Sequence, residues 1–277
     1  MSSCNLVIVE GIPGSGKTST AHFVADWLGE NGLSPYLFLE GDLDHPADYE
    51  STACLKDDEY ALLLERFPRQ SAELQGLAAR RGGEVFLSYR KLQSPPAELA
   101  AELARRDVYE LPLADWQRVT LARWDWFARA AADEPGVFVF ECCFLQNLLT
   151  TPLAKFDQPE SEAGAHVLHV AGTLRDLCPA LIYLDPPNVR ATLEKTAANR
   201  PQEWLDFVAA YTAGQGWGAA RGLSGFDGMV RFYETRRRLE KTLVPALRTP
   251  GFSTLWLENA GLDWKADHAR IRAFLHT

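Results

Sequence analysis

The sequence lacks several features that mark common classes of protein. Its five cysteines form no C-x-x-C pair and their number is odd, so we expect reduced thiols rather than a disulfide framework. No apolar stretch approaches the roughly 20 residues that a membrane helix needs. The apolar run Leu6 to Val9 is too short for the apolar region of a signal peptide. These absences predict a cytoplasmic protein that has no membrane partner.

An excess of basic residues is also absent, because 28 Lys and Arg face 37 Asp and Glu and the net charge is -9. Nucleic-acid binding depends largely on clustered Lys and Arg, so a general nucleic-acid binder is disfavoured. Repeats, low-complexity tracts and interdomain linkers are lacking as well. A chain of 277 residues with 47% hydrophobic residues is long enough for a sizeable core, and we expect a single domain over residues 1–277.

Short apolar runs predict the buried strands of a parallel sheet, with helical patterns between them. These runs cover residues 6–9, 36–39, 137–140, 181–184 and 254–257. Alternating strands and helices indicate an α/β layered fold. The connection between the second and third strands, about 55–135, is too long for a simple crossover, and its patterns at 98–106 and 113–133 predict a helical insertion. The glycine-rich segment 214–228 predicts a mobile loop.

The strongest motif is GIPGSGKT, Gly11 to Thr18, which matches G-x-x-x-x-G-K-[ST] between a predicted strand and an amphipathic helix. Such a loop turns backbone N–H groups toward phosphate oxygens and adds the positive potential of a helix N-terminus. Lys17 would reach the β- and γ-phosphates, and the Thr18 hydroxyl would ligate Mg²⁺. ATP and Mg²⁺ are therefore the expected cofactors. The residues predicted to bind the nucleotide are Gly11, Gly14, Ser15, Gly16, Lys17, Thr18 and Ser19.

The rest of the chain narrows the class of P-loop protein. No Asn is followed by Lys, so the N-K-x-D element of guanine-specific GTPases is absent and a switch GTPase is disfavoured. The third predicted strand ends in Val137-Phe138-Val139-Phe140-Glu141. Glu141 would lie beside the Mg²⁺ at the end of this strand and hold metal-bound water; alternatively, it caps the next turn. The metal ligands predicted from sequence are thus Thr18 and Glu141.

The second predicted strand leads directly into the acidic stretch EGDLDHPADYE, which contains G-D-x-x-H-P at Gly41 to Pro46. Ligands of open α/β sheets bind beyond the carboxyl ends of the strands, so Asp42 is expected to face the site across from Lys17. A carboxylate there can orient an acceptor hydroxyl and take its proton as it attacks the γ-phosphate. His45 is a further candidate for contact with the acceptor.

These motifs resemble those of the small-molecule kinases in the nucleoside-monophosphate-kinase-like superfamily. The string Gly41 to Pro46 is similar to the one that gluconate kinases carry after their second strand, and adenylylsulfate kinases show a related turn. The resemblance covers about the first 60 residues. It implies a P-loop NTPase fold with a five-stranded parallel sheet in the order 2-3-1-4-5, and an acceptor-side role for Asp42. Chloramphenicol phosphotransferases are built on this type of fold and are a further relative.

The same resemblance implies a lid that carries arginines after the fourth strand. Such a lid would occupy about 188–230, where Arg190, Lys195 and Arg200 are candidates and Arg200 is the one expected to act in catalysis. The arginines at 236–238 are expected to be solvated helix charges.

We therefore expect an ATP-dependent kinase that phosphorylates a hydroxyl of a small polar molecule, such as an antibiotic or a sugar-like metabolite. Lys17, Asp42 and Arg200 are the predicted catalytic residues. The residues predicted to bind the substrate are Asp42, His45, Glu141, Arg118 and Arg123. Two alternatives stay open: a nucleoside or nucleotide kinase, and a regulatory P-loop NTPase without a small-molecule acceptor. The regulatory alternative leaves the string from Asp42 to Pro46 unexplained.

Overall fold

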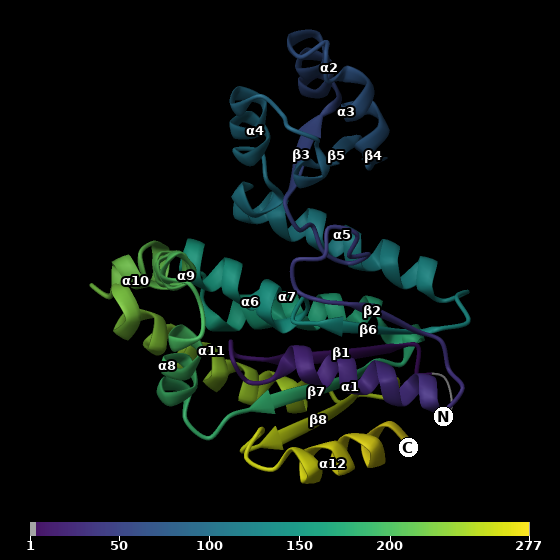
Figure 1. The fold of residues 1–277 in the computed structure, drawn as a ribbon, viewed down its shortest axis with the longest axis vertical. Helices are drawn as coiled ribbons and strands as arrows, with labels where there is room; N and C mark the ends of the chain where they lie inside the picture. The colour runs from purple at the N-terminus through teal and green to yellow at the C-terminus, as the bar shows by residue number, and fades with distance from the viewer. Residues whose placement is uncertain (1–3, 277) are drawn as a thin grey trace. The chain divides into compact units, whose positions relative to one another are not determined.

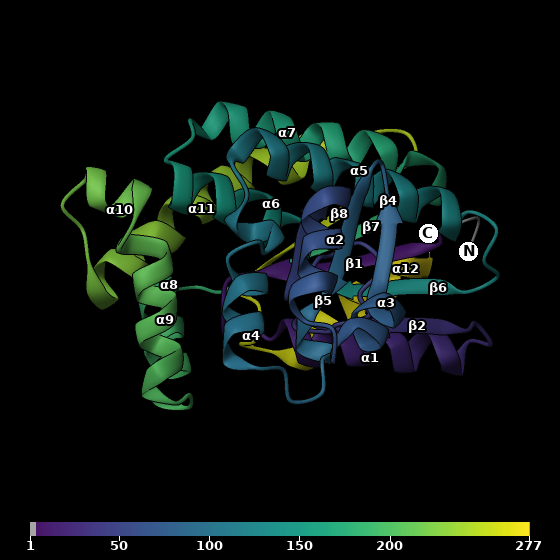
Figure 2. The ribbon, with the colours of Figure 1, turned by 90° about the horizontal axis from the view of Figure 1, so that it is seen from above.

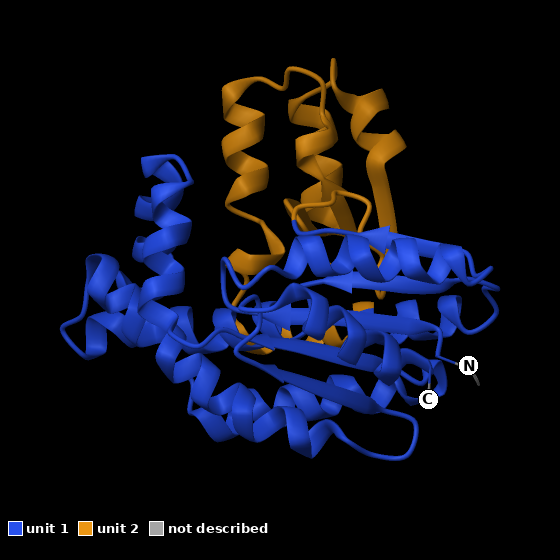
Figure 3. Ribbon diagram, turned by 60° about the horizontal axis from the view of Figure 1, so that its bottom comes forward, with its two compact units in different colours: residues 1–40, 124–277 blue, residues 41–123 orange. Residues whose placement is uncertain are grey.

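The computed structural model describes residues 4–276. Its chain divides into two compact units (Figure 3). The first unit comprises residues 1–40 and 124–277, and the second comprises residues 41–123. The second unit overlaps the insertion expected at about 55–135, but it begins and ends earlier in the chain.

The first unit is built on five parallel strands in the order β2-β6-β1-β7-β8 (Figure 1). The strands are β1 (Leu6–Gly11), β2 (Pro35–Phe38), β6 (Val137–Glu141), β7 (Ala180–Asp185) and β8 (Ser253–Glu258). Each overlaps one of the predicted apolar runs. Counted along the chain, their order is 2-3-1-4-5, so the predicted three-layer P-loop NTPase fold is confirmed. β1 is central because Val7 pairs with Val139 on one side and with Ala180 on the other.

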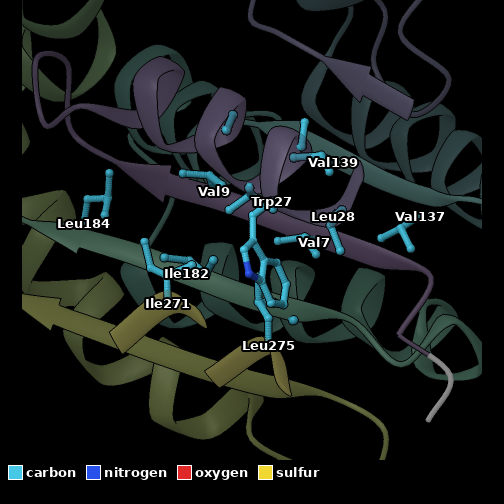
Figure 4. Close-up of a cluster of buried hydrophobic side chains, with 14 of the residues drawn as sticks. Val7, Val9, Trp27, Leu28, Val137, Val139, Ile182, Leu184, Ile271 and Leu275 are labelled. Carbon is cyan, nitrogen blue, oxygen red and sulfur yellow. The ribbon is translucent and has the colours of Figure 1, made fainter. Parts of the chain in front are cut away.

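Both faces of this sheet are covered, which explains why its strands are continuously apolar. α1 (Lys17–Glu30) and α12 (Trp264–His276) contribute Trp27, Ile271 and Leu275 to a core cluster with Val7 and Val139 (Figure 4). Figure 2 shows α7 (Glu160–Thr173) on the opposite side of the sheet from α1.

Aromatic rings contribute to packing on the second face. Phe138 and Phe140 alternate with the valines of β6 and therefore point away from α1. Their rings contact Phe127, whose centroid lies 5.1 Å from that of Phe138 and 4.9 Å from that of Phe140. Trp124 adds an edge contact with Phe140 at 6.0 Å. Both Trp124 and Phe127 belong to α5 (Leu113–Ala131), the longer of the two helices predicted in the insertion.

The segment expected to form a lid is largely helical. It contains α8 (Val189–Ala198), α9 (Gln202–Ala213), α10 (Gly216–Ala220) and the start of α11 (Gly225–Leu247). The predicted mobile loop at 214–228 is therefore wrong. Its glycines allow helices to pack closely: a Cβ on Gly228 would lie 2.6 Å from the Cβ of Ala213, and one on Gly218 would lie 2.0 Å from the carbonyl oxygen of Ala213.

Shorter elements complete the first unit. They are α6 (Leu145–Thr150), a π-helical turn (Thr151–Lys155) and a 3₁₀ turn (Arg175–Leu177). Within residues 4–276, no helix combines the length and the apolar character required to cross a lipid bilayer.

The second unit contains a three-stranded antiparallel sheet in the order β3-β5-β4. Its elements are β3 (Thr52–Lys56), α2 (Asp57–Arg66), α3 (Ser71–Leu77), β4 (Ala78–Arg81), β5 (Glu84–Ser88), α4 (Ala97–Ala104) and two 3₁₀ turns (Tyr89–Lys91 and Val108–Glu110). The helices agree with the predicted helical insertion, whereas the sheet was not predicted. Gly82 and Gly83 both have positive φ values, 60° and 83°, and form the tight turn between β4 and β5.

Candidate active site

The loop between β1 and α1 has the backbone conformation that its glycines predict. Gly11, Gly14 and Gly16 have φ values of 150°, 80° and 96°. A Cβ on Gly14 would lie 1.9 Å from the Oγ1 of Thr196, and one on Gly16 would lie 2.3 Å from the ring of Trp264. Both the backbone angles and the available space therefore require glycine at these positions.

The N-terminus of α1 is open to an anion. Gly16 occupies its N-cap without a side-chain hydrogen bond, and its first turn carries no acidic residue. The first N–H groups of a helix lack intrahelical partners and attract negative charge. Lys17 is buried beside them, and its ammonium donates to the carbonyl of Ile12 at 3.3 Å. This arrangement fits the predicted phosphate site, in which phosphate oxygens would take over hydrogen bonds from Lys17.

The structure brings the two predicted metal ligands together. The hydroxyl of Thr18 donates to Oε1 of Glu141 at 2.7 Å. Glu141 ends β6, and its Cα is in register with Val9 of the neighbouring β1. The start of α1 and the end of β6 thus place one hydroxyl and one carboxylate at the mouth of the phosphate loop.

A second carboxylate at this edge, Glu40, was not predicted. The backbone N–H of Glu40 donates to Oε2 of Glu141 at 3.4 Å, and Oε1 of Glu40 accepts from Nε2 of Gln146 at 2.8 Å. Ligand atoms of Glu40, Glu141 and Cys142 all lie within 4.8 Å of one another. The signal was present in the sequence, because Glu40 follows β2 almost directly and the carboxyl ends of parallel strands meet at one edge.

A pocket of about 620 Å³ opens at these residues. It is lined by Pro13, Gly14, Gly16, Lys17, Thr18, Ser19, Leu39, Glu40, Glu141, Gln146, Thr196, Asn199, Arg200, Trp204, Val208 and Tyr233. Of the predicted lid cations, Arg200 therefore faces the same pocket as Lys17. Arg190 instead pairs with Asp227 at 2.7 Å.

A buried ion pair supports the phosphate loop from behind. Arg236 is fully buried and binds Glu240, with 3.0 Å between Nε and Oε1. Its other nitrogens donate to the carbonyl of Gly11 at 3.2 Å and to the hydroxyl of Thr150 at 2.9 Å. Glu240 also accepts a hydrogen bond from the hydroxyl of Tyr183. The expectation that this arginine is a solvated charge is therefore wrong.

The two arginines that follow Arg236 on α11 differ in exposure. Arg237 binds the buried Asp185 with 2.9 Å between Nη2 and Oδ2, whereas Arg238 is exposed. Periodicity alone shows only that consecutive helical residues face different directions. Partners distant in sequence then decide which of the three is buried.

Glu10, inside β1, completes this buried network. Its carboxylate accepts backbone N–H groups of Phe144, Leu145 and Gln146 at 2.8, 2.7 and 3.2 Å, and so caps the start of α6. Burial, followed by the nearby Glu240, raises the pKa of Glu10 to about 7, while Arg236 opposes this shift. The capping bonds fix α6, and with it Gln146, next to the pocket.

In the second unit, the acidic stretch forms a turn of its own. Oδ1 of Asp42 accepts the N–H of Asp44 at 2.9 Å, and the carbonyl of Asp42 accepts the N–H of His45 at 3.2 Å. His45 is buried, and its Nδ1 accepts the N–H of Ala47 at 3.1 Å. Burial, with a smaller effect from Arg123, lowers the pKa of His45 to about 3. A neutral imidazole thus stabilises the loop.

The two arginines predicted to bind the substrate also make contacts within this unit. Arg123 donates to the carbonyl of His45 at 2.9 Å and lies 5.1 Å from the ring centroid of Tyr49. Arg118 binds Glu84 through two nitrogens, at 3.1 and 2.6 Å. These contacts stabilise the unit itself, and the substrate roles of Asp42, His45, Arg118 and Arg123 stay predictions.

No protein-family model matches the chain, and no curated protein matches it. Solved structures of deoxyadenosine kinase from M. mycoides are similar to it. The structure with bound dATP is 11% identical, with a TM-score of 0.41, over 98% of this chain and 100% of that one. The structure with bound dCTP is 11% identical, with a TM-score of 0.42, over 98% of each chain. A third, with the products dCMP and dCDP, is 12% identical, with a TM-score of 0.41, over 98% of each chain.

We expect the free energy of unfolding of the protein to decrease as the pH decreases, because of His45. Its pKa in the folded state is about 3, below the ordinary value of 6.5, so the unfolded chain binds a proton that the folded chain does not. The contribution is complete above pH 6.5 and is lost as the pH falls toward 3. Between pH 7 and 5.5 the wild type should lose about 1 kcal/mol more than His45→Asn, which keeps an acceptor but does not titrate. Urea unfolding at each pH measures the difference, and parallel pH profiles would contradict it.

The Arg236–Glu240 pair leads to a second prediction. Glu240→Ala should lower the free energy of unfolding by about 3–5 kcal/mol, because it leaves a fully buried guanidinium without its carboxylate. The double variant Arg236→Met/Glu240→Met removes both charges and should recover much of this loss. Glu98→Ala, which removes the exposed partner of Arg66, is the matched control and should change stability little. Denaturant unfolding of the three variants tests this, and equal losses for Glu240→Ala and Glu98→Ala would refute it.

Proposed function

We propose that the protein is a Mg²⁺-dependent phosphotransferase that moves the γ-phosphoryl group of ATP to a hydroxyl of a small molecule, in the cytoplasm. The observation that carries this proposal is the 2.7 Å hydrogen bond between Thr18 and Glu141 at the mouth of the phosphate loop. This hydrogen bond places the two predicted metal ligands next to the phosphate loop, in one pocket that also contains Lys17 and Arg200. Phosphoryl transfer requires mainly positioning and charge neutralisation, and this pocket provides groups for both.

Different residues of the chain would bind different parts of ATP and its Mg²⁺. The phosphate oxygens would accept the N–H groups at the start of α1 and the ammonium of Lys17. The hydroxyl of Thr18 and the carboxylate of Glu141 are oxygen donors of the kind that Mg²⁺ prefers, so the donor set fits this ion. Bound there, Mg²⁺ would neutralise charge on the β- and γ-phosphates. Arg200, at the other side of the pocket, would stabilise the charge of the transferring group.

Glu40 is the residue that we assign to the acceptor. It shares the pocket with Lys17, and Gln146 holds one of its carboxylate oxygens at 2.8 Å, which leaves the other oxygen available to orient a hydroxyl. A carboxylate in that place would accept the proton of the hydroxyl as the new O–P bond forms. From the sequence, this role was predicted for Asp42, whose Oδ1 accepts the N–H of Asp44.

The experiment that tests the proposed function is a panel of hydroxylated metabolites and antibiotics, incubated with the protein, ATP and Mg²⁺. ADP release would be measured, and mass spectrometry would identify phosphorylated products. Acceptor-dependent ADP release that disappears in Lys17→Ala supports the proposal. Basal hydrolysis that no acceptor accelerates would favour a regulatory NTPase instead.

Substitution of the two carboxylates distinguishes their roles. Glu40→Gln should lower the rate of transfer by roughly 10²- to 10⁴-fold while ATP affinity stays nearly unchanged, as expected for the loss of a general base. Asp42→Asn is the matched variant from the same stretch and should have the smaller effect. Single-turnover rates and the affinity for ATP would be measured for both variants. If Asp42→Asn lowered the rate of transfer more than Glu40→Gln did, Asp42 and not Glu40 would be the residue that orients the acceptor.

A further inference from the structure

The charges that line the pocket restrict the chemical class of the acceptor. Among the described lining residues, Lys17 and Arg200 are the only lysine or arginine, and Glu40 and Glu141 are the only acids. ATP needs both cations, because its β- and γ-phosphates would lie against Lys17 and the transferring group against Arg200. Neither Lys17 nor Arg200 would then be available to form an ion pair with a phosphate group on the acceptor.

The other arginines of the predicted lid and of α11 do not replace them, since each has an acidic partner. Arg190 pairs with Asp227 at 2.7 Å, and Arg221 pairs with Asp157 at 2.7 Å. Arg237 is bound to Asp185, and Arg236 is fully buried against Glu240. An acceptor phosphate would bring a further charge of about -1.5 to -2 beside Glu40. Repulsion between these like charges would oppose its binding.

The pocket also has an aromatic and aliphatic wall. Trp204 and Val208 are one turn apart on α9 and therefore share a helix face, and Tyr233 of α11 is buried beside the pocket. The guanidinium of Arg200 lies 5.8 Å from the ring centroid of Trp204. Ligand sites that combine flat apolar surfaces with a few polar groups typically bind ring-bearing molecules.

One polar atom at this site points to the polar groups of the ligand. Oε1 of Gln146 is buried and has no hydrogen-bond partner among the described residues, while Nε2 of the same amide binds Glu40. A buried amide oxygen without a partner destabilises the protein, and a donor on a bound ligand would satisfy it. The acceptor is thus expected to carry an N–H or O–H group besides the hydroxyl that reacts.

From these observations we propose that the acceptor is an unphosphorylated, ring-bearing compound that has a hydroxyl group and a further hydrogen-bond donor. A nucleoside or a hydroxylated aromatic antibiotic belongs to this class. A nucleoside monophosphate and an acyclic sugar acid do not. The inference rests on the proposed function, because it concerns the acceptor of that same reaction.

Matched acceptors test the charge argument. Thymidine and adenosine, each beside its 5′-monophosphate, and chloramphenicol beside gluconate would be supplied with ATP and Mg²⁺, and ADP and phosphorylated products would be measured. At least one unphosphorylated ring compound should be phosphorylated, and neither the monophosphates nor gluconate should be. Phosphorylation of a monophosphate or of gluconate would overturn this inference while leaving the proposed function intact. If neither these compounds nor any other hydroxylated compound of the wider panel raises ADP release although the protein binds ATP through Lys17, the proposed function itself fails.

Two variants of α9 test the aromatic wall with the phosphorylated compound identified in that panel. Trp204→Ala should raise the KM for this acceptor about tenfold or more, because the ring of the acceptor would lose the aromatic side chain on which it stacks. The KM for ATP should change far less, and Trp204→Phe should restore most of the affinity. Phe207→Ala is the matched control, because Phe207 is on the same helix, is 67% exposed and does not line the pocket. An increase in the KM for ATP alone, or equal effects of Trp204→Ala and Phe207→Ala, would refute the role of this wall.

Discussion

The phosphate loop depends on a charge that is buried behind it. Arg236 is 0% exposed, and one of its nitrogens donates to the carbonyl of Gly11, the first residue of the loop. Glu240 compensates the charge, and Tyr183 of β7 holds Glu240 in turn. A buried ion pair adds little net stability, because desolvation offsets much of the attraction. Here the ion pair affects geometry instead. It connects helix α11 and strand β7 to the backbone that would bind phosphate.

The topology of the sheet then determines which polar side chains surround the loop after β1. β1 lies between β6 and β7, so the loop after β1 is flanked by the ends of both neighbours. β6 supplies Glu141 to Thr18, and β7 supplies Asp185, which Arg237 binds from α11. β2 lies on the far side of β6. It supplies Glu40, whose backbone N–H reaches Glu141 because the ends of β2 and β6 lie close together. Parallel strands therefore bring together residues that are about a hundred positions apart in the sequence, without any local motif.

Much of this could be predicted from the sequence, because local patterns determine it. The five apolar runs and the P-loop motif identify the strands, and the Thr18–Glu141 contact follows from two adjacent strand ends. The small sheet of the second unit was missed because β3, β4 and β5 are 4–5 residues long and lie among stronger helical signals. Arg236 was missed because only its distant partners show that it is buried. The glycines at 214–228 were misread because close helix packing and loop flexibility both require small residues.

The acidic stretch after β2 shows what the structure adds to such patterns. Its first carboxylate, Glu40, lies in the first unit and lines the pocket, whereas Asp42 lies in the second unit and accepts the N–H of Asp44. In the sequence these residues are nearly equivalent, since both follow the strand by a short distance. Their different hydrogen-bond partners separate them: Gln146 orients Glu40, and the turn itself uses Asp42. A general base must be oriented toward the group that it deprotonates, and among the two only Glu40 has a partner that lines the pocket. The boundary between the units therefore falls between a carboxylate that lines the pocket and a carboxylate that forms the turn.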